Sequence, residues 1–232
     1  MGSVAQSLRK LFRGGSSSEP KSSTPQGRVQ ARSSRRSSGL GELTRALAGR
    51  EGLCVLDIGA TSPDNIQHFT ELGYKVYSED VLLASKEQQY CVADADGKQV
   101  VDEKQFLSDN LNYGAQTFDA VLCWDMADYM EEALVKPVVA RLWSVLKPGG
   151  LVLAFFHTKD AGPDAPFYRY HIAGTDNLEL QLLNGAGRNG NSDGLRLQRV
   201  FNNRHIENLF RDYANIKFFL ARDNVREVLV KR

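Results

Sequence analysis

A turn of small residues follows a strongly apolar run and offers a place to bind a ligand. The run is Leu53–Ile58, and the turn continues as Gly59, Ala60 and Thr61 before a helical pattern begins. Small residues let the backbone approach a ligand closely, and the N-terminus of the following helix carries free N–H donors. The spacing therefore predicts a ligand site at this turn, with Asp57 beside it.

Acidic residues also follow two later apolar runs. Glu79 and Asp80 lie about 20 residues after the turn, where a carboxylate can accept hydrogen bonds from both hydroxyls of a ribose. Trp124 and Asp125 place an aromatic ring and a carboxylate at the end of another run. Because ligands in open α/β sheets lie beyond the carboxyl ends of the strands, we expect all three segments to face one site.

Apolar runs typical of strands alternate with helical patterns through the body of the chain. This alternation predicts right-handed βαβ units and a mostly parallel sheet covered by helices. The expected strands are Leu53–Ile58, Lys75–Ser78, Tyr90–Ala93, Phe118–Trp124, Leu151–Phe156, Ile216–Leu220 and Val225–Val230. The expected helices are a short one near Leu40 and Leu47, then Pro63–Leu72, Val100–Leu111, Glu131–Leu146 and Asn203–Tyr213.

Residues 158–200 do not follow this alternation and form an expected insertion. Two runs of alternating polarity, Leu178–Leu183 and Leu195–Val200, flank a connection that contains two Asn-Gly pairs. Asn-Gly is favoured in tight hairpin turns. We therefore expect a β-hairpin or flap here.

The N-terminal residues 1–38 differ in composition from the rest of the chain. They carry eight Lys or Arg and one acidic residue, a net charge of +7, whereas residues 39–232 carry 21 basic and 27 acidic residues, a net charge of −6. This Ser- and Arg-rich segment has too few apolar residues to offset its conformational entropy, so we expect it to be disordered and dispensable for folding. Contact with nucleic acid or an anionic surface is expected only through this tail.

Composition also limits the location of the protein and the classes of site. No apolar run approaches the about 20 residues of a membrane span, and no secretory signal is apparent, so we expect a cytoplasmic protein. Cys54, Cys91 and Cys123 stand singly, without the spacing of a zinc site or a disulfide framework. We expect no metal site.

The ordered motifs of the chain resemble those of class I S-adenosylmethionine-dependent methyltransferases. The resemblance rests on V-L-D-I-G-A at 55–60, Asp80, F-D-A-V-L-C-W-D at 118–125 and L-K-P-G-G at 146–150, and spans residues 40–232. It implies an α/β fold, a Rossmann-like doubly wound, mostly parallel seven-stranded sheet with an antiparallel last strand and helices on both faces. It also implies S-adenosylmethionine as the cofactor.

The resemblance assigns cofactor contacts to the turn and to the residues around it. Gly59, Ala60 and Thr61 would pass under the cofactor, while Asp57 would orient the turn or meet the methionine amino group. The turn departs from the Gly-x-Gly-x-Gly pattern of the family, because Thr61 and Pro63 replace the second and third glycines.

Further contacts are assigned to residues that follow the later strands. Asp80 would bind the ribose hydroxyls, with Glu79 as the second choice because strand alternation directs it the other way. Asp94 matches the acidic residue that bonds the adenine amino group. Trp124 and Asp125 would flank the methionine end of the cofactor.

The candidate acceptor residues follow the fourth and fifth expected strands. Asp125 is either a catalytic base that orients the substrate or a helix N-cap. His157 and Tyr129 lie at the ends of strands, where they would contact the acceptor or simply close the pocket. Arg169 and His171 lie in a segment expected to form a lid over an acceptor, or else an ordinary surface flap.

The sequence leaves two interpretations of the function. The favoured one is methyl transfer from S-adenosylmethionine to an unidentified acceptor. The alternative is a non-catalytic interaction or regulatory module of the same fold, because the glycine turn is degenerate. Binding of the cofactor discriminates between them.

Overall fold

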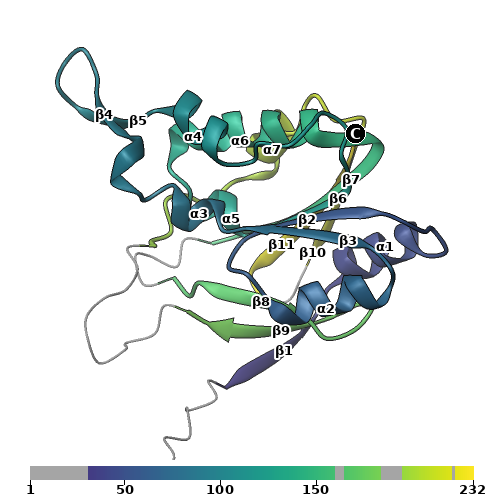
Figure 1. Ribbon diagram of the computed structural model, residues 1–232. Helices are drawn as coiled ribbons and strands as arrows, with labels where there is room; N and C mark the ends of the chain where they lie inside the picture. Colours follow the sequence, from purple (N-terminus) through teal and green to yellow (C-terminus); the bar gives the residue numbers. More distant parts are fainter. Residues whose placement is uncertain (1–30, 160–164, 184–194, 221–222) are drawn as a thin grey trace, which may run out of the picture. The chain divides into compact units, whose positions relative to one another are not determined.

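The protein is built around a six-stranded sheet. The computed structural model describes residues 31–159, 165–183, 195–220 and 223–232 (Figure 1). Within them the main sheet has the strand order β10-β11-β7-β6-β2-β3. These strands are β2 (Cys54–Ile58), β3 (Lys75–Glu79), β6 (Phe118–Trp124), β7 (Leu146–His157), β10 (Asn215–Leu220) and β11 (Val225–Lys231).

Strand direction in this sheet agrees with the expectation from the sequence. β3, β2, β6 and β7 pair in parallel, and β11 is antiparallel to both β7 and β10. The chain runs from β2 outward to β3 and then returns to β6 on the other side of β2. This reversal makes the carboxyl ends of β2 and β6 the switch point, where ligands bind in open α/β sheets.

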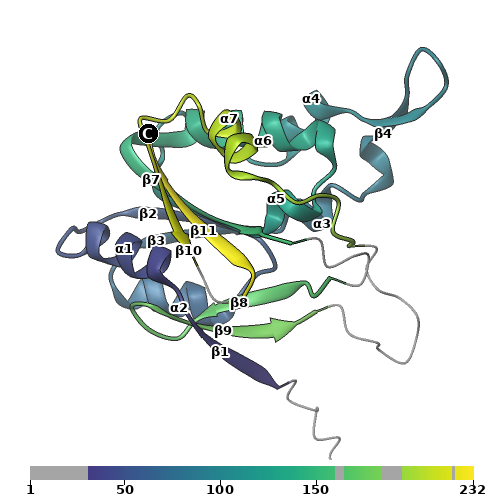
Figure 2. The same ribbon diagram turned by 180° about the vertical axis from the view of Figure 1, so that it is seen from behind.

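The expected third strand does not join the main sheet. β4 (Cys91–Ala93) instead pairs with β5 (Gln99–Val101) in a separate hairpin that extends from the body (Figures 1 and 2). Strand β4 is exposed along its whole length, so it lacks the apolar faces of a central strand. The seven-stranded prediction was therefore wrong by this strand. The helix expected over 100–111 begins only at α4 (Glu103–Asp109), where Asp102 caps it.

Helices cover both faces of the sheet, as predicted. One core contains α4, α6 (Glu132–Val145) and α7 (Asn203–Leu209), and Figure 2 shows these helices together on one side. A second core contains α1 (Ser38–Leu47) and Phe69 of α2 (Pro63–Glu71) on the other side. The short helices are α3 (Val81–Ala84), η1 (Gln88–Tyr90) and α5 (Met126–Tyr129). No helix in the described ranges has the length and apolarity to cross a membrane.

A second, three-stranded antiparallel sheet packs against the second core. Its order is β1-β9-β8, formed by Arg32–Arg36, Asn177–Leu182 and Tyr168–Ile172. The first strand lies in the segment that we expected to be disordered, so the folded part begins before Gly39. Residues 31–38 fold because every residue of β1 pairs with β9 and because Ser37 caps α1. Residues 1–30, the rest of the expected tail, lie outside the described residues.

The insertion also pairs differently from the prediction. β9 pairs with β8 and β1, whereas residues 195–200 form no strand. The backbone N–H groups of Gln198 and Arg199 donate instead to the carbonyl of Asp128, which holds this segment against α5. The expected hairpin between 178–183 and 195–200 was therefore wrong. Its connection, 184–194, lies outside the described residues.

Candidate functional site

The turn after β2 is a helix N-terminus held by a serine. Ser62 is buried, and its hydroxyl caps α2 by accepting from the backbone N–H of Asn65 at 3.3 Å. Pro63 takes the first helical position, where its missing N–H costs nothing. Ser62 and Pro63 therefore begin helix α2 at positions where the family pattern has further small residues.

Asp57 braces this turn from below. It is 1% exposed, and its two carboxylate oxygens accept from Asn65 Nδ2 at 2.8 Å and from Trp124 Nε1 at 2.6 Å. Burial raises the pKa of Asp57 to about 6, although both hydrogen bonds oppose this shift. In this structure Asp57 therefore orients the turn and holds the indole of Trp124 over it.

Trp124 occupies the space directly above the glycine of the turn. A Cβ atom at Gly59 would lie 2.9 Å from Trp124 Cδ1. The indole also stacks on Tyr170, with the ring centroids 5.0 Å apart and the planes at 5°. The cavity that remains between the turn, Trp124 and Tyr170 measures about 10 Å³.

The cofactor implied by the resemblance does not fit this cavity as it stands. Sites for ligands of this size have volumes of about 300 Å³ or more, whereas a cavity of about 10 Å³ holds at most one water. The turn itself, Asp57 and Asp80 are of the expected residue types. The mismatch is therefore one of volume, and two aromatic side chains cause it.

The acidic pair after β3 divides between two tasks. Asp80 caps α3 by accepting from the N–H of Leu83 at 3.0 Å, and its charge acts on Asp57 at the carboxyl end of β2. Glu79 points elsewhere, accepting from the N–H of Leu111 at 2.9 Å and from the hydroxyl of Tyr113. Strand alternation separates the two carboxylates as predicted.

Asp94 is not brought to the site. It lies in the turn of the β4–β5 hairpin, where Oδ1 accepts from the N–H groups of Asp96 at 3.0 Å and Lys98 at 2.9 Å. Because this hairpin is separate from the main sheet, Asp94 closes a turn here.

Asp125 is a buried carboxylate at the carboxyl end of β6. It is 2% exposed and accepts from the hydroxyl of Tyr170 at 2.9 Å. Burial raises the pKa of Asp125 to about 7, against the opposing effects of His157 and the Tyr170 hydroxyl. It precedes α5 but makes no side-chain capping bond, so its carboxylate faces the site instead of the helix.

His157 is joined to a carboxylate that sequence reasoning missed. Asp128 Oδ2 lies 2.8 Å from His157 Nδ1 and 2.6 Å from the backbone nitrogen of the same residue. Asp128 is fully buried, and its Oδ1 has no hydrogen-bond partner. Burial lowers the pKa of His157, but the hydrogen bond and charge of Asp128 outweigh burial and hold the pKa above its ordinary value. No local pattern in the sequence identifies Asp128, a residue of α5, as the partner of His157.

A larger cavity of about 950 Å³ lies beside the end of β7. His157 and Lys159 line it from β7 and the residues that follow, and the β1 strand lines another side. Tyr168 and Tyr170 line both this cavity and the small one above the glycine turn. These two tyrosines therefore separate the two spaces.

The other candidate acceptor residues support the fold around the site. Tyr129 is fully buried and donates to the carbonyl of Pro166 at 2.7 Å, so it closes the wall. Arg169 and His171 lie on the opposite face of β8 from Tyr168 and Tyr170, and neither lines the two cavities. The residues of β8 that reach the cavities are Tyr168 and Tyr170, which alternate with the two residues that the sequence suggested.

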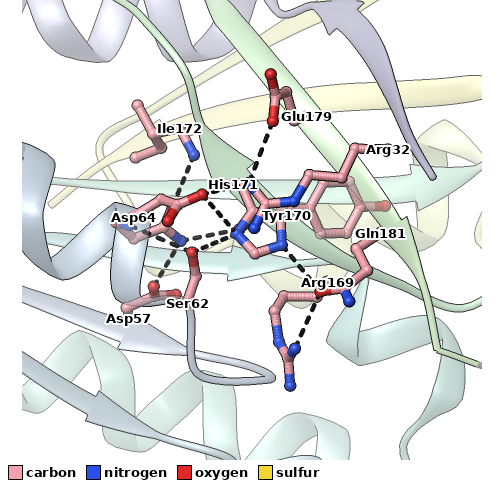
Figure 3. Close-up of polar contacts among 11 residues, drawn as sticks. Arg32, Asp57, Ser62, Asp64, Arg169, Tyr170, His171, Ile172, Glu179 and Gln181 are labelled. Carbon is pink, nitrogen blue, oxygen red and sulfur yellow. Dashed lines mark hydrogen bonds and ion pairs between the residues drawn. The ribbon is translucent and has the colours of Figure 1, made fainter. Parts of the chain in front are cut away.

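His171 holds the second sheet against α2, as Figure 3 shows. Its Nδ1 lies 2.9 Å from Ser62 Oγ and 3.2 Å from Asp64 Oδ2, and its Nε2 lies 3.2 Å from Gln181 Oε1. A hydrolytic triad needs the serine and the carboxylate on different ring nitrogens, whereas here both meet Nδ1. The cluster is therefore a structural contact. Among the described residues, no group of His, Cys, Asp and Glu is suited to hold a metal ion.

Comparisons with solved structures return methyltransferases of low identity. An N1-methyltransferase from Burkholderia thailandensis, solved with 1,6-didemethyltoxoflavin and S-adenosylhomocysteine, is 15% identical with a TM-score of 0.46, covering 83% of this chain and 76% of that one. A putative type 11 methyltransferase from Sulfolobus solfataricus is 16% identical with a TM-score of 0.46, covering 82% and 89%. A methyltransferase from Aquifex aeolicus is 13% identical with a TM-score of 0.44, covering 83% and 88%. A search of curated proteins found no significant match.

A protein family model also matches most of the chain. A family model described as a methyltransferase domain matches residues 32–213, from the first described strand to the end of α7 and beyond it. The matched region contains the switch point, the glycine turn and both cavities' principal walls. The chain belongs to this methyltransferase domain family and is an S-adenosylmethionine-dependent methyltransferase domain.

Proposed function

We propose that this protein methylates an oxygen or nitrogen atom that carries a proton, on a small molecule held in the cavity of about 950 Å³, with His157 as the base. The observation that carries the proposal is the pair of His157 and Asp128. The carboxylate is fully buried and holds Nδ1 at 2.8 Å, while the ring lines the cavity.

This geometry favours one tautomer of the imidazole. When Nδ1 donates its proton to Asp128, Nε2 becomes the acceptor, which is the state that a general base needs. S-adenosylmethionine supplies an already activated methyl group, so the chain has to orient the acceptor and remove its proton. His157, at the carboxyl end of β7, can remove this proton.

The proposal predicts a pH profile. Because the pKa of His157 lies above the ordinary 6.5, the neutral base form becomes dominant only as pH rises through that higher value. Turnover should therefore increase with pH through an apparent pKa above 6.5 and then level off. Initial rates of S-adenosylhomocysteine release between about pH 5.5 and 9, with a panel of small phenols and amines as acceptors, measure this pH profile.

The matched variants are His157→Asn and His205→Asn. Loss of a general base lowers turnover by about 100-fold or more, so the first variant should lose activity to that extent and lose the pH dependence as well. His205 is exposed on α7 and serves as the control, with unchanged turnover. Full turnover of His157→Asn with any methylated acceptor of the panel would remove His157 from the reaction.

A further inference from the structure

The side chains of Trp124 and Tyr170 fill the place where a cofactor would lie against the glycine turn. The indole lies against Gly59 and contacts two aromatic rings: Tyr170 stacks on it, and the Phe155 ring meets it in an edge arrangement with the centroids 5.6 Å apart. Trp124 is 4% exposed and Tyr170 is 3% exposed. The space left is about 10 Å³, so no part of a nucleoside enters without movement of these rings.

The backbone at Trp124 is held in a conformation that bulky residues rarely adopt. Its φ angle is +47°, in the left-handed region. The pairing of β6 with β7 also shifts register between Leu122 and Trp124. Strain of this kind persists only where surrounding contacts maintain it, and it clusters at functional switches. The contacts that maintain it here are the stack on Tyr170 and the hydrogen bond to Asp57.

Tyr170 is fixed from the second sheet. Its hydroxyl donates to Asp125, and its carbonyl accepts from Asn65 Nδ2 at 3.0 Å. Asn65 also donates from Nδ2 to Asp57 and accepts from the N–H of Ile172 at 2.7 Å through Oδ1. One amide therefore ties the glycine turn, the helix after it and strand β8 together, and it keeps the phenol ring over the indole.

Space for movement lies on one side of this pair. Tyr170 lines the cavity of about 950 Å³ as well as the small one, so the larger cavity is the side toward which its ring can turn. Once the ring leaves, the indole loses its stacking partner and can leave the turn. Opening the cofactor site and changing the wall of the larger cavity are then one event.

We propose that Trp124 and Tyr170 form a gate that closes the cofactor site, and that the cofactor binds only after the indole has left Gly59. This Trp124–Tyr170 gate concerns cofactor entry and does not depend on the role of His157. The effect of Trp124 on cofactor affinity distinguishes a gate from a direct contact. A residue that contacts the cofactor strengthens binding, whereas a gate residue weakens it.

The first experiment compares affinities for S-adenosylhomocysteine by calorimetry. Trp124→Ala should bind at least tenfold more tightly than the wild type, since the substitution removes the ring that must otherwise be displaced. Trp143→Ala is the matched control, because Trp143 lies on α6 and lines neither cavity, and its affinity should equal that of the wild type. Equal or weaker binding by Trp124→Ala would overturn the gate, and so would the absence of binding by both proteins at millimolar ligand.

The second experiment keeps the native gate and does not depend on the stability of the alanine variant. The chain has two tryptophans, so Trp143→Phe leaves Trp124 as the single indole fluorophore. On mixing with S-adenosylhomocysteine, its emission should shift to longer wavelength, and the observed rate should approach a plateau with ligand concentration because opening precedes binding. Binding without a change in emission, or a rate that rises linearly to the highest concentration, would show that the indole stays in place. Unchanged turnover of His157→Asn would contradict the proposed base alone and leave these readouts unaffected.

Discussion

Arg35 brings a positive charge into the interior, where the carboxylates of Glu227 and Asp223 compensate it. Its side chain is 7% exposed and donates from Nη2 to Glu227 Oε1 at 2.8 Å, and it also pairs with Asp223. Glu227 is 1% exposed and accepts in addition from Ser37 Oγ at 3.0 Å and the N–H of Gly39 at 2.6 Å. A buried charge is tolerated only with such partners, so removal of one partner leaves the other uncompensated.

Arg35→Ala is therefore expected to destabilise the protein by about 3–5 kcal/mol, the usual cost of leaving a buried charge alone. The guanidinium also lies 4.9 Å from the centre of the Phe155 ring, so packing is lost as well. Chemical denaturation measures the free energy of unfolding. Arg36→Ala is the control, because Arg36 is exposed and its loss should not change stability. A loss below about 1 kcal/mol for Arg35→Ala would place this pair with ordinary surface ion pairs.

At the level of single residues, the sequence indicated the position of the site better than its contacts. Asp57 lies at the carboxyl end of β2, while Asp80 and Asp125 follow β3 and β6, and these positions come from spacing. The partner of His157 could not be identified, because Asp128 reaches it only through the fold. Nor could spacing show that Trp124 lies on Gly59, since this depends on the rotation of one side chain.

At the level of elements, the second sheet decides where the domain begins. Strand β1 supplies Arg35 and pairs along its length with β9. A chain that begins at Gly39 lacks both, so its melting temperature should fall by about 10 °C, given that 1 kcal/mol corresponds to about 2–4 °C at this size. A chain that begins at Ala31 is the control and should melt with the full-length protein. Equal melting of both chains would mean that β1 adds no cooperative stability.

The contact between this sheet and α2 should depend on pH through His171. Burial is the main cause that lowers the pKa of His171 below 6.5, so the folded state holds the neutral ring. Below pH 6.5 the unfolded chain binds a proton that the folded chain does not, and stability is lost as pH falls. Above pH 6.5 the contribution is constant.

The raised pKa values of Asp57 and Asp125 act in the opposite direction, so the test is a difference between two proteins. His171→Gln cannot titrate, and its stability relative to the wild type should improve between pH 7.5 and pH 5. Denaturation at both pH values measures this difference. Parallel pH dependence of the two proteins would show that His171 is protonated without cost in the folded state.

The strands of the main sheet were predictable, whereas the partners of the strands outside it were not. β2, β6 and β11 are apolar enough to be central whatever surrounds them. β4 has an apolar sequence but is exposed, and β1 is rich in serine and arginine, yet each finds a partner strand. Pairing of this kind depends on segments far away in the chain, which local propensity does not register.

At the level of the whole molecule, the two cavities share a wall made of tyrosines. The mostly parallel sheet and the covering of both faces followed from the alternation of patterns, and the motifs at 55–60, 80, 118–125 and 146–150 indicated the family. The division into a small and a large cavity could not be predicted in this way, because it depends on where Tyr168 and Tyr170 of β8 lie. The place of the methyl acceptor in the larger space therefore remains a proposal from the structure.

The long reach of Arg35 has a consequence for how the chain folds during synthesis. Arg35 and Glu227 are 192 residues apart. Strand β1, the first described element to be synthesised, therefore forms this contact only after Glu227 of β11 has been synthesised. Contacts of such separation raise the contact order and slow folding, because the entropy of closing a long loop is lost before the contact forms. A nascent chain on the ribosome therefore carries the Arg35 guanidinium without Glu227 even after β9, the partner strand of β1, has been synthesised. Only the synthesis of Glu227 completes this buried ion pair.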